Sequence, residues 1–340
     1  MRTLLRHRNV WLGCAMLWII LFHSGFELQN PLLYFKELGY GGVDLCLFAS
    51  GVGCYFSLEK DADPLRFYKR RLVRLGPAYL CSILIWLFCK TRTAGFPPEA
   101  VIGNLLGIQS LTDSGNDFNW YISALLVFYL LAPYLKALAD RINHPVGHIL
   151  TFCVLLLLSV PFWNAFSYIV AVTRLPVFYA GFLFAKQCRG EKPLGSFHIF
   201  AYILAVFAGI LLLYLGQHFL SSLLWSHGLS WYPFLLIAPG LCVLISCLAN
   251  AVENLRPCQW LLSLLAFLGK YSFEIYLVHI PLYEALTPWI DRFPSAAEKT
   301  LLWFGTIPLI ALGCALLRFA SKALCRAAKR LPSLIPISIR

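Results

Sequence analysis

Residues 10–28 read VWLGCAMLWIILFHSGFEL, and this stretch determines the class of fold. As a helix it is long enough to cross about 30 Å of hydrocarbon, which takes roughly 20 residues. Before Glu27 it carries no charged residue and one histidine, His23. A titratable side chain in hydrocarbon is costly, so His23 is a candidate for a functional site. The alternative is a histidine that hydrogen-bonds and packs between helices.

The rest of the chain is similarly apolar. Over 340 residues it is 59% hydrophobic and 13% charged, a balance that a soluble core of this size cannot accommodate. We therefore predict an all-α integral membrane protein, folded as a single domain over residues 1–340, with a bundle of about ten transmembrane helices. The apolar segments that predict these helices are 10–28, 39–57, 73–90, 119–138, 147–164, 168–186, 197–218, 231–249, 260–283 and 300–318.

Basic residues predict the orientation. If the N-terminus is cytoplasmic, 21 of the 28 Lys and Arg residues lie in cytoplasmic segments, as the positive-inside rule requires. Both termini are then cytoplasmic. This bias and contact with anionic membrane lipids explain the net charge of +12, so no nucleic-acid partner is expected. The twelve cysteines show neither a C-x-x-C pair nor the spacing of a zinc site, and we predict no metal.

Four polar side chains are predicted to share one level near the outer surface. His23 lies about five residues before the outer end of the first helix and Asp44 about five residues after the outer start of the second, roughly 7 Å deep in each case. Arg174 and His279 fall in the same layer of later helices. A shared level favours an active site. For Asp44 the alternative is capping of its helix, and for Arg174 and His279 it is anchoring at the membrane interface.

Neighbouring residues supply partners for this layer. Ser272, Tyr276 and His279 have i, i+4, i+7 spacing and share one helix face. Glu27 lies four residues after His23, so we expect its carboxylate to accept a hydrogen bond from one imidazole nitrogen. The other nitrogen then faces a substrate hydroxyl. A base held by an orienting carboxylate is suited to the activation of a hydroxyl.

A second signal lies on the predicted cytoplasmic side, where residues 67–79 read FYKRRLVRLGPAY. Arg71 and Arg74 are three residues apart on one helical face, and they suit multidentate binding of phosphate. Arg70 and Tyr79 complete the predicted donor-binding segment. An acyl-coenzyme A offers both several phosphates and an activated acyl group. The alternative is an ordinary basic loop that binds acidic lipid.

Five segments, in their order along the chain, resemble the membrane acyltransferase-3 family. Residues 41–51, GGVDLCLFASG, resemble its second-helix signature, and residues 71–79 resemble its Arg-x-x-Arg element with a following Pro and Tyr. The other segments are 120–133, 174–181 and 269–281. The resemblance covers nearly the whole chain.

This resemblance implies a ten-helix enzyme of the bacterial cell membrane. Such an enzyme passes an acyl group, usually acetyl or succinyl, from cytoplasmic acyl-coenzyme A to a hydroxyl of a cell-envelope polysaccharide, a lipid-linked sugar or a related acceptor. His23 matches the catalytic histidine of the family, and Arg71 and Arg74 match its paired arginines.

The chain departs from the family pattern in two places. Family members often carry a basic residue eleven positions before the histidine, where this chain has Leu12. They also often carry two Phe residues where this chain has Cys46 and Leu47. Both departures concern the part of the chain expected to hold the donor.

We predict that the acyl group is transferred directly. His23 removes the proton of the acceptor hydroxyl as its oxygen attacks the thioester carbonyl, and Ser50, Tyr276 or Arg174 stabilises the developing oxyanion. An acyl-enzyme on Cys46 or Ser50 is an alternative. A different class, a polytopic transporter or flippase for a polar or lipid-linked metabolite, also stays open, although such folds often contain two related halves that this sequence lacks.

Overall fold

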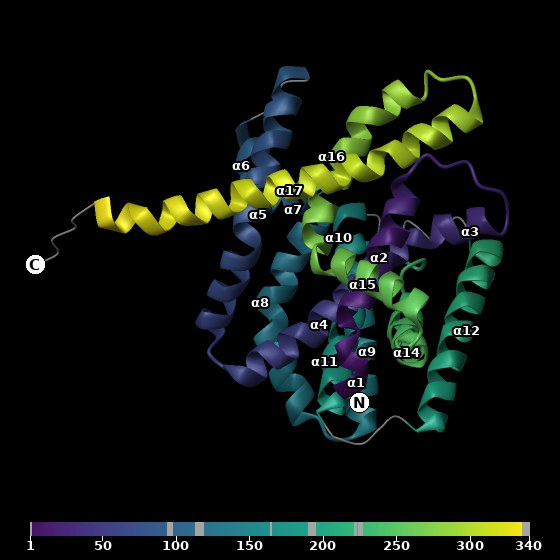
Figure 1. Cartoon of the computed structure of the whole chain (residues 1–340). Coiled ribbons are helices and arrows are strands. Elements are labelled where there is room, and N and C mark those ends of the chain that lie inside the picture. Colours follow the sequence, from purple (N-terminus) through teal and green to yellow (C-terminus); the bar gives the residue numbers. More distant parts are fainter. Residues whose placement is uncertain are drawn as a thin grey trace, which may run out of the picture.

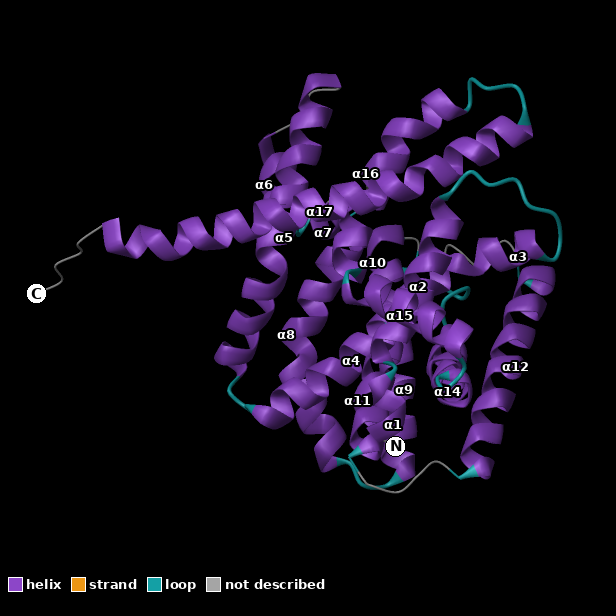
Figure 2. Ribbon diagram, in the orientation of Figure 1, coloured by secondary structure: helices purple, strands orange, loops and turns teal. Residues whose placement is uncertain are grey.

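The structure is a computed structural model that describes residues 2–93, 98–112, 119–163, 165–189, 195–220, 223 and 227–334. Within these residues every regular element is a helix, which confirms the predicted all-α class (Figure 2). The helices are α1 (Arg2–Arg6), α2 (Arg8–His23), α3 (Leu32–Glu37), η1 (Leu38–Gly41), α4 (Gly42–Lys60), α5 (Pro64–Thr93), α6 (Pro98–Leu106), α7 (Gln109–Thr112), α8 (Trp120–Arg141), α9 (Pro145–Leu157), η2 (Val160–Phe162), α10 (Phe166–Val172), α11 (Leu175–Cys188), α12 (Ser196–Phe219), α14 (Phe234–Val252), α15 (Arg256–Lys270), α16 (Ser272–Ile290) and α17 (Ala296–Leu334).

The helices form a bundle whose two ends differ. Figure 1 shows α1 and the N-terminus at one end and α6 at the other, with α5 running between the two ends. The α16–α17 hairpin lies at the end that holds α6, and α17 crosses the other helices on its way to the C-terminus. The chain therefore carries residues from distant parts of the sequence to each end of the bundle.

Eight of the described helices are long and apolar enough to cross a membrane, or nine if the bent pair α15–α16 forms one span. Each of the ten predicted segments coincides with a helix or a helix pair, although α2 has only 16 residues. The ninth predicted helix, residues 260–283, is not continuous, because α15 and α16 meet at Tyr271 with a bend of 76°. The predicted segment is therefore a bent pair of helices rather than one helix.

Close packing against α2 explains this bend. A Cβ atom on Gly13 would overlap the Leu265 carbonyl, and one on Gly269 would overlap the Asn9 carbonyl. The absence of side chains at both glycines lets the backbones of α2 and α15 touch along the N-terminal half of α2. The chain must turn after this contact for α16 to reach the opposite end of α2.

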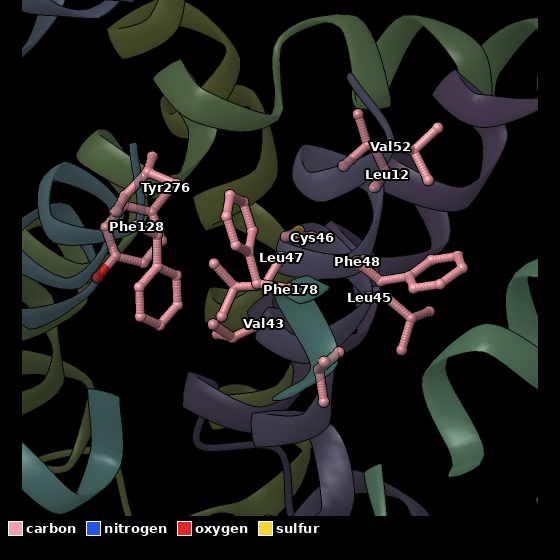
Figure 3. Close-up of a cluster of buried hydrophobic side chains, with 14 of the residues drawn as sticks. Leu12, Val43, Leu45, Cys46, Leu47, Phe48, Val52, Phe128, Phe178 and Tyr276 are labelled. Carbon is pink, nitrogen blue, oxygen red and sulfur yellow. The ribbon is translucent and has the colours of Figure 1, made fainter. Parts of the chain in front are cut away.

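The core is centred on α4, most of whose residues are buried. Trp11 of α2 contacts the Phe48 and Phe184 rings at centroid distances of 6.3 and 6.2 Å, and its indole donates to Ser246 Oγ at 2.6 Å. Figure 3 shows Leu12, Cys46 and Tyr276, from three different helices, in one buried cluster. This packing fixes the positions of α2, α4 and α16 relative to one another.

Candidate active site

His23 is the last residue of α2 and its side chain is exposed. Its Nδ1 lies 3.0 Å from the Ile19 carbonyl oxygen. A carbonyl oxygen can only accept a hydrogen bond, so in the neutral imidazole Nδ1 carries the proton and Nε2 keeps its lone pair. The side chain is thus held as a base with its free nitrogen available to a substrate.

Glu27 does not orient this imidazole. The chain leaves the helix at Ser24, whose backbone is extended, so Glu27 is not one helical turn above His23. Glu27 is exposed, and the Ile19 carbonyl takes the place that was predicted for its carboxylate. The prediction failed because it extended the first helix beyond its actual end.

A second histidine meets the first. The rings of His23 and His279 lie edge to face with their centroids 5.3 Å apart. His279 is fully buried, and its Nδ1 lies 2.9 Å from the Ile275 carbonyl, so its Nε2 is also an acceptor. That Nε2 is buried and has no hydrogen-bond partner among the described residues. The Tyr276 ring lies 5.9 Å from His279, so the structure brings these three predicted site residues together.

Asp44 and Arg174 pair with each other in the interior. Arg174 Nε lies 3.5 Å from Asp44 Oδ2, and both side chains are almost completely buried. The guanidinium lies between the rings of Trp120 and Trp231, 5.0 and 4.9 Å from their centroids, and donates to the Val170 carbonyl at 2.7 Å. Asp44 makes no side-chain capping bond, although it lies in the first turn of α4. The arrangement ties α4 to α10 and α11, and leaves Arg174 little freedom to contact an oxyanion.

A small cavity lies next to the histidines. Its volume is about 50 Å³. Its wall comes from four helices: Leu12, Met16, Ile19, Val43, Cys46, Tyr121, Ser272, Phe273 and Tyr276. Ile19 also provides the carbonyl that holds His23, and Tyr276 contacts the His279 ring, so the cavity lies one residue away from each histidine, although neither imidazole lines it. Ser272 and Phe273 begin α16, and the positive end of that helix dipole therefore faces the cavity.

Two arginines converge on α4 at the other end of α2. Nη2 of Arg71 donates to the Gly53 carbonyl at 3.3 Å, and Nε of Arg8 donates to the Ala49 carbonyl at 3.0 Å. A Cβ on Gly53 would lie only 3.1 Å from Arg8 Nη2, so the glycine makes room for this guanidinium. The charges of Arg71 and Arg74 both act on Arg8.

Three arginines at this end carry charge that no nearby carboxylate of the described residues neutralises. Arg8, Arg71 and Arg74 make no ion pair with a carboxylate in the described part of the chain, whereas Arg70, beside them in sequence, does. The Arg71 guanidinium also lies over the Phe67 and Tyr129 rings, at 5.0 and 5.3 Å, which fixes its position. Unpaired guanidinium groups held in place are suited to phosphate.

Arg8 counted only toward the orientation and was not predicted as a site residue. Its position does contain a signal. Arg8, Leu12, Met16, Ile19 and His23 are spaced by three or four residues and therefore lie on one face of α2. Arg8 is one turn before Leu12, so its long side chain places a positive charge close to where the family pattern has one.

Arg70 turns away from this cluster. Its Nη1 donates to Asp61 Oδ2 at 2.6 Å, in the loop between α4 and α5. Hydrogen bonds from Arg70 lower the pKa of Asp61, and hydrogen bonds from Arg66 lower the pKa of Asp63. Arg70 therefore stabilises this loop, and the structure does not place it where the predicted phosphate contact requires.

Ser50 and Tyr79 do not lie where their predicted roles require, which were oxyanion stabilisation for Ser50 and donor binding for Tyr79. Ser50 Oγ lies 3.3 Å from the Tyr129 hydroxyl, whose ring contacts Arg71, so Ser50 belongs to the arginine end of the bundle. The Tyr79 hydroxyl donates to the Asn104 carbonyl and so holds α5 against α6. Ser50 is not placed to stabilise an oxyanion beside His23.

A large apolar groove of about 540 Å³ runs from Arg71 toward Phe273. Lys69 and Arg71 lie at one end of the groove. Tyr79 and Phe273 also line the groove. The α5 residues in its wall run from Tyr68 to Leu80, about 18 Å along the helix. The remaining lining residues are Leu72, Leu75, Gly76, Leu105, Leu106, Ile108, Ile122, Leu125, Leu126, Tyr129 and Leu130. Phe273 also lines the small cavity, so the two spaces are neighbours.

Comparison with known proteins identifies the family of the chain. A family model described as an acyltransferase domain matches residues 11–319. The chain belongs to this acyltransferase family. A curated relative, Acyltransferase MdmB of Streptomyces mycarofaciens, is 24% identical over 292 residues, which cover 76% of this chain and 72% of that protein. No solved structure matches the chain.

The predicted family and the predicted enzyme class are therefore confirmed. The part of this acyltransferase that matches the family includes His23, Arg71 and His279, and it begins after Arg8. The matches support acyl transfer rather than the transporter or flippase alternative.

Proposed function

We propose that this acyltransferase moves an acyl group from cytoplasmic acyl-coenzyme A to a hydroxyl of a cell-envelope polysaccharide, a lipid-linked sugar or a related acceptor. One observation carries the proposal. A single face of α2 runs from Arg8 at one end, past Leu12, Met16 and Ile19 in the cavity wall, to His23 at the other. The anion site and the base are about 22 Å apart along this face.

The arginine end binds the donor. Arg8, Arg71 and Arg74 hold the phosphates of coenzyme A, because their guanidinium groups are not neutralised by carboxylates in the described part of the chain. The pantetheine arm follows the apolar groove between α5 and α8 toward Phe273. The thioester then lies at the small cavity, beside the histidines.

The chemistry at the histidine end is a direct acyl transfer. The acceptor hydroxyl gives its proton to Nε2 of His23, and its oxygen forms a bond to the thioester carbonyl carbon. The carbon–sulfur bond breaks, the coenzyme A thiolate leaves, and it takes the proton from His23. The amino end of α16, with the Ser272 and Tyr276 hydroxyls, faces the cavity and stabilises the oxyanion of the tetrahedral intermediate.

The proposed function includes a topology. With α2 and the α15–α16 pair counted as spans, the bundle crosses the bacterial cell membrane ten times and both termini are cytoplasmic. The arginine end then faces the cytoplasm, where acyl-coenzyme A is made, and the histidine end faces the acceptor outside. The positive-inside rule supports this orientation.

The direct test is an acyl-transfer assay. Purified protein in detergent or nanodiscs is given acetyl-coenzyme A labelled in the acetyl group, with a panel of envelope glycans and lipid-linked sugars. We expect label in an acceptor together with free coenzyme A, and neither product from the His23→Gln variant. Absence of transfer to every acceptor from every acyl-coenzyme A would contradict the proposed donor.

A further inference from the structure

The small cavity near the histidines has no role in the binding of the coenzyme A phosphates, and its position and lining suggest another role. It lies against Ile19, one turn before His23, and against Phe273, which it shares with the groove. A thioester that follows the groove toward Phe273 brings its acyl end to this cavity, one helical turn from the base.

The size of the cavity restricts what it can hold. An apolar cavity of about 150 Å³ accommodates a benzene molecule, which has six heavy atoms. A cavity of about 50 Å³ has room for roughly a third of that, about two heavy atoms. With the carbonyl at its mouth, the cavity holds the methyl group of an acetyl or the ethyl group of a propionyl chain, whereas a longer chain requires one wall to move.

The polarity of the wall restricts the charge. None of the lining residues is a lysine, arginine or histidine, and the polar groups present are the hydroxyls of Tyr121, Ser272 and Tyr276 and the thiol of Cys46. A carboxylate buried here has no cation to pair with and loses its hydration. The hydroxyls and the amino end of α16 serve the oxyanion at the mouth, whereas a succinyl group, with four carbons and a carboxylate, exceeds the volume of the cavity and finds no cation inside it, so it is excluded.

Cys46 limits the cavity on the α4 side. Its side chain is 8% exposed and lies opposite Met16 and Tyr276, which line the same space from α2 and α16. Figure 3 shows Cys46 within the buried cluster that also contains Leu12 and Tyr276. The backbone of α4 is fixed by its packing, so the length of the side chain at position 46 sets the depth of the cavity.

We propose that this cavity is the acyl pocket of the enzyme, that it selects uncharged acyl groups of two or three carbons, and that Cys46 sets their length. The inference rests on the proposed function. During transfer the carbonyl carbon stays at the mouth of the cavity below His23 while its bond to sulfur breaks and its bond to the acceptor oxygen forms. The alkyl part does not react and is bound only by the cavity wall.

The test is donor selectivity, measured with acetyl-, propionyl-, butyryl- and succinyl-coenzyme A. Each variant is described by ratios of kcat/KM within one preparation, so any misfolded fraction cancels. Cys46→Ala deepens the cavity, Met16→Ala widens it from the opposite wall, and Cys46→Leu fills it. Cys188→Ala is the matched control, because Cys188 of α11 is also buried and lines neither space.

We expect the unmodified enzyme to prefer acetyl and propionyl donors over butyryl and succinyl donors. Cys46→Ala and Met16→Ala should each raise the butyryl-to-acetyl ratio by about tenfold, since one methylene in an apolar pocket changes discrimination by at least that factor. Cys46→Leu should lower the propionyl-to-acetyl ratio, and Cys188→Ala should change neither ratio.

The outcomes separate this inference from the function on which it rests. Transfer with a preference for succinyl, or butyryl-to-acetyl ratios that are unchanged in both alanine variants, overturns the acyl pocket while the proposed function stands. No transfer from any of the four donors to any acceptor overturns the proposed function, and the acyl pocket with it.

Discussion

The imidazole rings of His23 and His279 lie edge to face, 5.3 Å between centroids, and each donates its Nδ1 proton to the carbonyl four residues earlier in its own helix. The two rings nevertheless have different surroundings, because His23 is exposed and His279 is fully buried. Only His23 can meet a substrate directly. His279 packs against the His23 ring from the interior, so substitution of the two residues should lower kcat to different extents.

His23→Gln should reduce kcat by a factor of about 10² to 10⁴, because the amide keeps the size and the hydrogen bonding of the side chain but cannot accept a proton. The measurement is coenzyme A release with a saturating acceptor. His218→Gln, on the outer helix α12, is the control and should be fully active. Activity of His23→Gln close to that of the unmodified enzyme would remove the general-base role.

His279→Phe should lower kcat by about tenfold while the KM for the donor changes little. The phenyl ring keeps the contact with His23 but loses the Nε2 acceptor, and a positioning residue costs less than the base itself. Steady-state kinetics of both histidine variants in the same assay decide this. A loss as large as that of His23→Gln, with expression intact, would show that His279 handles the proton itself.

Arg8→Ala and Arg71→Ala should each raise the KM for acyl-coenzyme A by about tenfold or more, since a hydrogen bond to a charged group contributes roughly 1.5–3 kcal/mol. Arg71→Lys should restore only part of the affinity, because the planar guanidinium is lost. The acceptor KM should change less than the donor KM.

Arg70→Ala is the matched control for these variants, because Arg70 is adjacent in sequence and is paired with Asp61. Its donor KM should match that of the unmodified enzyme. If Arg70→Ala raises the KM for the donor as much as Arg71→Ala does, the segment acts through its net charge, and the assignment of Arg71 to a specific phosphate site is wrong.

Loss of either member of the Asp44–Arg174 pair should destabilise the fold strongly. Removing one partner leaves a buried charge uncompensated, which costs about 3–5 kcal/mol. Asp44→Asn and Arg174→Met should each lower the thermal unfolding midpoint in detergent, and the double variant should recover part of the loss. Equal midpoints for the single variants and the unmodified protein would show that the pair is not structural.

Cysteine labelling tests the orientation of the bundle. In a background without the native cysteines, Ser295→Cys, between α16 and α17, should react with an impermeant thiol reagent in intact cells. Asp61→Cys, between α4 and α5, should react only after the membrane is permeabilised. The reverse pattern would place the arginine end outside the cell and separate it from cytoplasmic acyl-coenzyme A.

Hydropathy and motif spacing predicted the helical class, the apolar segments and the proximity of His23, Tyr276 and His279, because these depend on local composition and on helix periodicity. The break at Tyr271 could not be predicted in this way. It depends on the contact of Gly269 with the backbone of Asn9, which is distant in sequence. Glu27 was misplaced for a related reason, since the end of α2 is a property of the folded chain.

The pairing of Asp44 with Arg174 shows the same limit. The sequence predicted a common level for them but not their contact or the two tryptophan rings around the guanidinium, which come from α8 and from the segment before α14. Arg8 was within reach of sequence reasoning, because its spacing along α2 places it in phase with His23.

The position of Phe273 has a consequence for the membrane itself. Its ring lines the groove on one side and the small cavity on the other. An enzyme that delivers a group across a bilayer must do so without discharging the ion gradients that the bilayer maintains. A cavity of about 50 Å³ is too small for an ion with its hydration shell, and an aromatic ring stands at its edge. If the acyl group takes the proposed route, the narrowness of this cavity also keeps ions from following it.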